Sequence, residues 1–169
     1  KTKITNRSAT TMDGATVIRR FTKSVDGTKI PLNIILPPGV TEDGGNACVV
    51  YGYGGYGVNL EPRFKPLNRI LMDHNVIYVV ANLRGGGEYG EQWHLEGNLT
   101  NKQNVFDDFA ACVKYMTTSG YTTPQRTAIL GGSNGGLLMG ATLSQHPQMV
   151  KAVVALVGIY DMLRLELSP

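Results

Sequence analysis

A serine enclosed by glycines, between an apolar strand pattern and an apolar helix pattern, most restricts how this chain can fold. The segment reads Thr127-Ala128-Ile129-Leu130-Gly131-Gly132-Ser133-Asn134-Gly135-Gly136-Leu137-Leu138-Met139. It fits the Gly-x-Ser-x-Gly nucleophile elbow, in which a serine projects from a strained turn after a strand. Side chains two residues before and after that serine would collide, so glycine is required at both places. A flexible glycine-rich turn is the alternative, but the flanking strand and helix favour the elbow.

Short apolar runs elsewhere in the chain predict a sheet that is buried on both faces. They are rich in Val, Ile, Leu and Ala, which is typical of parallel strands; they are Ala47–Tyr51, Val76–Ala81, Thr127–Leu130 and Ala152–Val157. Helical patterns alternate with them, at Leu67–Asp73, Val105–Thr118 and Gly135–Gln145. Strands that alternate with helices indicate an α/β fold with a doubly wound, mostly parallel sheet.

The N-terminal part of the chain has a different pattern. Residues 1–15 are polar and predict a linker or an arm from a preceding domain. Val17–Lys23 and Lys29–Leu36 flank an Asp26-Gly27 pair, which is a strong signal for a β-hairpin.

Two helices carry finer expectations. In Val105–Thr118 the apolar residues follow helical spacing, Asn104 can cap the helix, and Asp107 and Asp108 suit its positive first turn. Gly135–Gln145 is apolar almost all round, so we expect that helix to be buried.

Composition and charge exclude several classes of protein. With 42% hydrophobic and 17% charged residues, the chain of 169 residues is globular and large enough for one core. A net charge of +3 without basic runs argues against a nucleic-acid surface, and no apolar run is long enough for a membrane span. Cys48 and Cys112 lie in apolar segments and predict buried free thiols.

Two glycine-rich loops follow predicted strands. Gly52-Tyr53-Gly54-Gly55-Tyr56-Gly57 and Gly85-Gly86-Gly87-Glu88-Tyr89-Gly90 both match the Gly-x-Gly-x-x-Gly dinucleotide pattern. Neither opens a clear helix, and the charge of Glu88 would repel a pyrophosphate. A loop after an early strand supplies the second oxyanion donor in α/β-hydrolases, which fits the first loop better. Packing aromatics are the plain alternative for its two tyrosines.

Four blocks taken together resemble the prolyl oligopeptidase family of serine peptidases. They are residues 51–56, residues 82–94 (Asn-Leu-Arg-Gly-Gly-Gly-Glu-Tyr-Gly-Glu-Gln-Trp-His), residues 102–109 (Lys-Gln-Asn-Val-Phe-Asp-Asp-Phe) and residues 131–138 around the serine. The resemblance runs from about Phe21 to Leu165. It implies the N-terminal part of an α/β-hydrolase domain over residues 16–169, and a β-propeller domain elsewhere. In the second block we expect Arg84 to pair inside the protein.

The resemblance also implies site residues. Ser133 corresponds to the nucleophile, Tyr53 to a phenol donor of the oxyanion hole, and Asn134 to the backbone N–H donor. Tyr56 and Ile159 correspond to walls of a pocket for the proline ring of a short peptide, since a rigid apolar ring fits such a pocket with little loss of entropy. Neither a metal nor a cofactor is implied.

The acid and the base of a catalytic triad are not recognisable in the sequence. In this fold they follow the serine in the order Asp, His. His146 lies at the far end of the helix, about 20 Å from Ser133 at 1.5 Å per residue; His74 and His94 precede the serine and fit surface or loop positions. Asp161 comes one strand too early and fits local pairing.

We therefore expect an incomplete domain whose acid and base lie beyond Pro169. Alone it would be inactive, and would self-associate or need its missing C-terminal half. A related oligopeptidase or acyl-peptide hydrolase, a non-catalytic partner-binding piece and a dinucleotide domain stay open as alternatives. Cytoplasm and periplasm both stay open as compartments.

Overall fold

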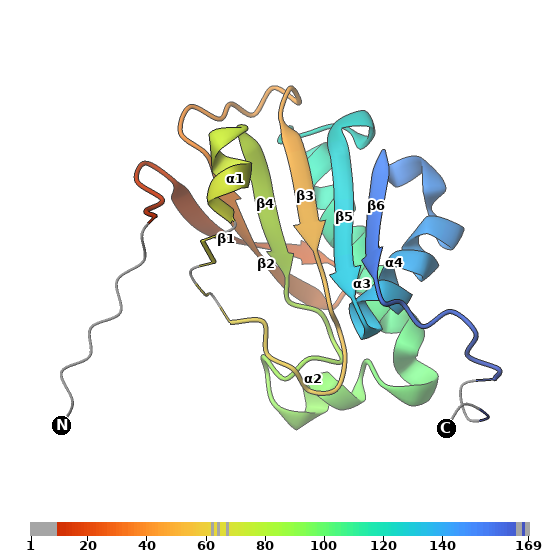
Figure 1. The fold of residues 1–169 in the computed structure, drawn as a ribbon. Helices are drawn as coiled ribbons and strands as arrows, with labels where there is room; N and C mark the ends of the chain where they lie inside the picture. The colour runs from red at the N-terminus through yellow and green to blue at the C-terminus, as the bar shows by residue number, and fades with distance from the viewer. Residues whose placement is uncertain (1–9, 62, 64, 67, 165–166, 168–169) are drawn as a thin grey trace.

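A six-stranded mixed sheet organises the chain (Figure 1). The structure is a computed structural model and describes residues 10–61, 63, 65–66, 68–164 and 167. Its strands are β1 (Thr16–Lys23), β2 (Lys29–Leu36), β3 (Ala47–Tyr51), β4 (Val76–Ala81), β5 (Thr127–Gly132) and β6 (Ala152–Leu156). Its α-helices are α1 (Asn68–Asp73), α2 (Glu91–Leu95), α3 (Lys102–Thr118) and α4 (Asn134–Gln145).

The strand order is β1-β2-β4-β3-β5-β6. β1 pairs with β2 and β2 with β4 antiparallel, whereas β4, β3, β5 and β6 pair in parallel. The predicted hairpin followed by a parallel sheet is confirmed. In Figure 1, α3 and α4 lie behind the sheet and α1 lies in front of β4. The carboxyl ends of β3 and β5 are therefore neighbours, which brings the loop after β3 beside the turn after β5.

The hairpin turn has the geometry that its sequence predicts. Gly27 has a φ of 85°, a left-handed value that glycine adopts without strain. The Asp26 carboxylate accepts a hydrogen bond from the Thr28 N–H at 2.9 Å, and the Gly27 N–H bonds to the Ser24 carbonyl at 3.0 Å. Of the predicted arm, residues 1–9 lie outside the described residues, as does Leu67 of the first predicted helix.

Helix α3 forms much of the core but begins earlier than predicted. A 3₁₀ turn at Leu99–Asn101 leads directly into Lys102, so Asn104 lies inside the helix. Asn104 therefore does not cap it, and its side-chain amide instead donates to the Glu96 carbonyl at 2.8 Å. The predicted apolar face is confirmed, with buried residues at helical spacing: Val105, Phe109, Cys112, Val113 and Met116.

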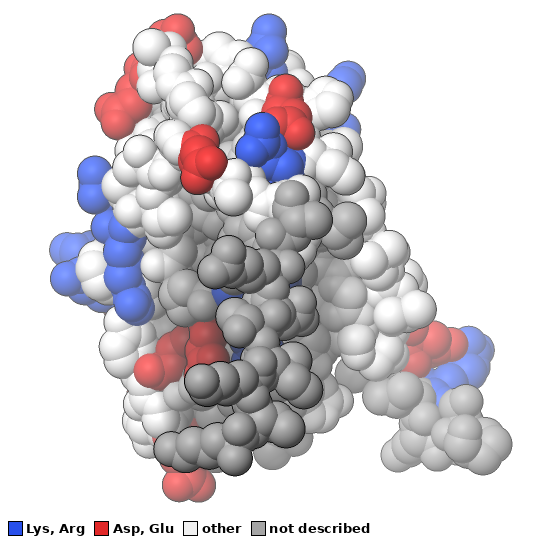
Figure 2. Space-filling view, turned by 60° about the vertical axis from the view of Figure 1, so that its left-hand side comes forward, with Lys and Arg blue, Asp and Glu red and all other residues white. Residues whose placement is uncertain are grey.

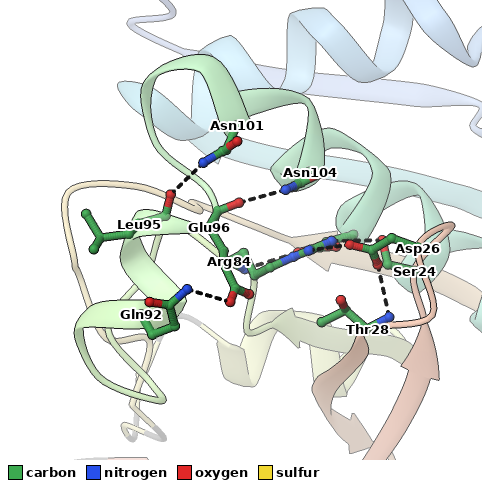
Figure 3. A network of polar contacts seen from close by, with 10 residues as sticks. Ser24, Asp26, Thr28, Arg84, Gln92, Leu95, Glu96, Asn101 and Asn104 are labelled. Atoms are coloured by element: carbon green, nitrogen blue, oxygen red, sulfur yellow. Dashed lines mark hydrogen bonds and ion pairs between the residues drawn. The ribbon is translucent and has the colours of Figure 1, made fainter.

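Asp108 is the charged residue that α3 buries. The Arg84 guanidinium donates to both of its oxygens, from Nη2 at 2.6 Å and from Nε at 2.9 Å. Arg84 Nη1 also pairs with Asp26, so one guanidinium ties the hairpin turn to α3 (Figure 3). This confirms the expected internal pairing of Arg84. The hydrogen bond from Arg84 lowers the pKa of Asp26 to about 2. The ion pair between Arg84 and Asp26 therefore persists until the pH falls to about that value.

The far edge of the sheet is more open than predicted. We expected a buried helix at α4, but Leu143 is 48% exposed, because among the described residues only one side of α4 packs on β5 and β6. On the edge strand β6, Val154 is 45% and Leu156 is 56% exposed. This edge is an apolar surface, and no other strand of the described residues pairs with the outer side of β6.

The remaining surface and core features are simple. Cys48 and Cys112 are buried free thiols, as predicted, and burial raises the pKa of both. Charges of both signs are scattered over the face seen in Figure 2, and neither sign covers it. None of the helices in the described ranges is long and apolar enough to cross a membrane.

Replacing Arg84 by Met should destabilise the fold strongly. The change leaves the Asp108 carboxylate buried without its partner, which costs about 3–5 kcal/mol. Arg164→Met is the matched control, because it removes an exposed pair with Asp161 and should cost less than about 1 kcal/mol. Urea unfolding measures both values. Equal, small losses would show that the buried pair contributes no more than a surface pair.

Candidate active site

Ser133 stands in a strained turn between β5 and α4. Its φ of 57° and ψ of −118° are unusual for a residue with a side chain, and the residue is exposed. Two backbone hydrogen bonds hold the turn. The Ser133 N–H bonds to the carbonyl of Leu156 in β6 at 2.9 Å, and the Ser133 carbonyl accepts from the Gly136 N–H at 2.8 Å. These features are those of the predicted elbow.

Glycine is required at the two positions that the motif specifies. A Cβ on Gly131 would lie 2.4 Å from the Gly135 carbonyl oxygen, and one on Gly135 would lie 2.7 Å from the Gly52 carbonyl oxygen. Both neighbours are backbone atoms that cannot move aside cheaply. At Gly132 the nearest atom would be 3.6 Å away, which is ordinary contact. The two positions that the Gly-x-Ser-x-Gly spacing specifies therefore exclude a side chain, whereas Gly132 between them and the serine does not.

The loop after β3 packs directly on the elbow. The Gly52 N–H bonds to the Leu130 carbonyl at 3.2 Å, which continues the pairing of β3 with β5. Tyr53 is half-buried, and atoms of its backbone and ring lie 3.5 Å from the point where a Cβ on Gly135 would be. The loop thus places Tyr53 against the first turn of α4.

Asn134 presents two different groups to its surroundings. As the first residue of α4, it has a backbone N–H without an intrahelical acceptor, next to Ser133. Its buried side chain faces the other way: Nδ2 donates to the Tyr53 carbonyl at 2.6 Å, and Oδ1 accepts from Lys102 Nζ at 2.9 Å. The side chain is therefore a strut between the elbow and the loop, and the backbone N–H remains without an intrahelical acceptor at the start of α4.

Lys102 is a site residue to which sequence reasoning gave no role. It lies in the first turn of α3, and its ammonium also donates to the Gly54 carbonyl at 2.9 Å. Burial lowers its pKa to about 8. The sequence showed Lys102 at the start of the block of residues 102–109. Its hydrogen-bond partners, Gly54 and Asn134, are 48 and 32 residues away in the chain, so no local pattern indicated them.

The two glycine loops pack on each other rather than around an open phosphate site. A Cβ on Gly85 would lie 2.7 Å from the Gly54 carbonyl oxygen, and one on Gly97 would lie 2.2 Å from the Gly85 nitrogen. Glu88 accepts hydrogen bonds from the Leu60 N–H and the Asn82 amide, both at 3.0 Å. The glycines thus serve close backbone contact, which argues against dinucleotide binding.

The predicted proline pocket is not closed by the described residues. Tyr56 is 76% exposed, and Ile159 is half-buried in the segment after β6. Cavities of about 800 and 550 Å³ lie elsewhere, between the hairpin and α3 and in front of the sheet at Tyr51 and Tyr78; their walls contain neither residue. These two cavities therefore do not lie at Ser133, and the pocket for a proline ring stays a prediction.

The positions of the histidines do not suit a base for Ser133. His146 forms the C-terminal cap of α4, at the opposite end from Ser133. His94 Nδ1 contacts the Gly57 N–H at 3.1 Å, and His74 Nδ1 contacts the Ile70 carbonyl at 2.8 Å. Asp161 pairs locally with Arg164, as expected. Across the described ranges, no three His, Cys, Asp or Glu residues group as a metal site.

Comparison with known proteins gives one consistent result. Residues 62–169 match the model of the prolyl oligopeptidase family. The chain is 46% identical to a prolyl endopeptidase of Elizabethkingia meningoseptica over 144 residues, which are 85% of this chain and 20% of that protein. The chain thus spans about a fifth of the length of the curated relatives that it matches.

Solved structures agree with the sequence match. A structure from a mechanistic study of two prolyl endopeptidases superposes with a TM-score of 0.91 at 45% identity, covering 94% of this chain and 23% of that one. Oligopeptidase B from Leishmania major superposes with a TM-score of 0.80 at 36% identity, covering 83% of this chain and 20% of that one. The predicted fold is confirmed as the corresponding part of this α/β-hydrolase family.

Adding a methyl group at Gly131 should disrupt the elbow, whereas the same change at Gly132 should be tolerated. Gly131→Ala forces two backbone segments apart and should cost about 1–3 kcal/mol or more, as overpacking does. Gly132→Ala meets only ordinary contacts and should change stability by less than about 0.5 kcal/mol. Denaturant unfolding of both variants tests this; similar costs at the two positions would contradict the geometry.

Proposed function

Because the chain belongs to the prolyl oligopeptidase family of peptidases, we propose that it carries the nucleophile and oxyanion donors of a serine peptidase that cleaves short peptides after proline. One observation carries the proposal: the strained, exposed Ser133 stands beside the free N–H of Asn134, with the Tyr53 loop packed on the same turn.

The proposed chemistry follows from what these groups can do. The Ser133 Oγ attacks the carbonyl carbon of the residue before the cleaved bond, and its proton passes to a base. The Asn134 N–H and the Tyr53 hydroxyl donate to the oxyanion that forms. Collapse of this intermediate expels the amine, which takes up the proton, and leaves an acyl group on Ser133. Water then releases the acid and restores the serine.

The base must come from outside the described residues in this proposal. His146 is at the wrong end of α4, His74 contacts the nearby Ile70 carbonyl, and His94 contacts the Gly57 N–H of the loop after β3. We infer that the acid and base belong to other parts of a longer polypeptide, together with a β-propeller domain. The short coverage of the relatives and the open edge at β6 support this inference.

The specificity of the proposed peptidase has two candidates, of which cleavage after proline is the first. A relative of this chain is named oligopeptidase B, so another specificity on the same elbow is a real alternative. Tyr56 and Ile159 would wall the proline pocket once further residues close it. Specificity profiling of the full-length protein separates the alternatives. A third possibility is a non-catalytic piece that binds a partner or itself through the apolar edge at β6.

Tyr53→Phe should slow peptide hydrolysis by the full-length protein without unfolding it. Loss of one oxyanion donor reduces kcat by about 100- to 1,000-fold. Tyr89→Phe is the matched control, because that tyrosine is 53% exposed and should leave kcat unchanged. Equal kcat values for the two variants would exclude the Tyr53 phenol as a donor.

The chain of 169 residues alone should hydrolyse a chromogenic Gly-Pro amide negligibly, because none of the histidines among the described residues is placed to accept the Ser133 proton. In the full-length protein, a fluorophosphonate probe should label Ser133, and Ser133→Ala should abolish both labelling and turnover. Turnover by the isolated chain at a rate typical of serine peptidases would refute the inferred absence of the base. Absence of label in the full-length protein would favour the non-catalytic alternative.

A further inference from the structure

A half-buried lysine joins the two segments that are proposed to form the oxyanion hole. Lys102 Nζ donates to the Gly54 carbonyl and to Asn134 Oδ1, both at 2.9 Å. Asn134 Nδ2 in turn donates to the Tyr53 carbonyl at 2.6 Å. Ammonium and amide thus bind two successive carbonyls of the β3 loop, and the Asn134 amide has one orientation that satisfies both bonds.

The ammonium has carbonyl oxygens for partners instead of a carboxylate. None of the ion pairs formed by the described residues includes Lys102. A half-buried lysine that bonds to neutral oxygens costs free energy on folding, because its charge loses water without gaining an opposite charge. A neutral side chain could hold these segments together at a lower cost in folding free energy, so the charge indicates more than a structural role.

We propose that Lys102 is a positioning residue of the oxyanion hole, holding the loop of Tyr53 and the Asn134 strut together so that phenol and N–H converge on one oxyanion. This inference rests on the function proposed above. The positive charge also bonds to Asn134 itself and to the residue after Tyr53, so it lies near both proposed donors and favours the negative charge that develops.

Lys102 is not the base that the site lacks. A base must reach the Ser133 hydroxyl with a free lone pair. Nζ instead bonds to Gly54 O and Asn134 Oδ1, and the charge of the ammonium strengthens both of these hydrogen bonds. The arrangement therefore favours the protonated form.

The protonated form depends on pH within an accessible range. Burial lowers the pKa of Lys102 to about 8, so its positive charge is lost and both hydrogen bonds weaken as the pH rises through that value. The facing loop carries the Tyr53 phenol, and residues 131–136 carry no charged side chain. Nearby on α3, the charge of Asp108 is paired with Arg84.

Lys102→Met in the full-length protein tests the proposal, with Lys114→Met as the matched control on the exposed side of α3. We expect Lys102→Met to lower kcat about 10- to 100-fold, the cost of a misplaced oxyanion hole, with KM changed less than about threefold. Lys114→Met should change neither. The wild type should lose kcat above about pH 8, and Lys102→Met should lack this alkaline decline.

Rebuilding the ammonium separates positioning from packing. Alkylation of Lys102→Cys with bromoethylamine restores a side chain of lysine length, and should recover most of kcat; the same treatment of the wild type is the control. A kcat within about twofold of wild type for Lys102→Met overturns the proposal, as does a loss that the rebuilt ammonium does not repair.

Failure of the proposed function has a different signature. If the wild type neither turns over peptides nor labels at Ser133, that function fails whatever Lys102 does. The positioning claim is then decided by NMR of the lysine Cε and the amides of Gly54 and Asn134. A common titration near pH 8, absent in Lys102→Met, supports the clamp, and independent titrations overturn it.

Discussion

The backbone contact between the loop after β3 and the turn after β5 is the constraint on which the site depends. It exists because β3 and β5 are parallel neighbours, so their carboxyl ends lie side by side. The contact is so close that a methyl group at Gly135 would reach the Gly52 carbonyl. Ser133 and Tyr53, the proposed nucleophile and phenol donor, therefore come from segments about eighty residues apart, yet sheet geometry brings these segments together.

Polar groups buried around this contact give it a second layer of support. Lys102 and Asn134 tie the loop to the elbow from inside, and Arg84 ties Asp108 of α3 to the hairpin turn. Buried charges contribute little net stability, but removing one partner is costly. We infer that this region tolerates few rearrangements, which is what precise placement of oxyanion donors requires.

Local signals were sufficient for the sheet and the elbow. The apolar runs predicted β3 and β4 to the residue, and the Gly-x-Ser-x-Gly spacing predicted the turn, because both depend on neighbours in the chain. The predictions that were wrong, or that were not made, concern features outside the local hydrophobic pattern. Asn104 lost its capping role to a preceding 3₁₀ turn, and the apolar surface of α4 is open on one side. The role of Lys102 depends on partners that are distant in sequence.

The hydrogen bond from the Ser133 N–H to the Leu156 carbonyl has a consequence for the timing of folding. The strained turn receives part of its support from β6, a strand that leaves the ribosome after the serine does. A nascent chain therefore cannot complete the turn around Ser133 while that strand is still inside the exit tunnel, and the elbow takes its strained form late in biosynthesis.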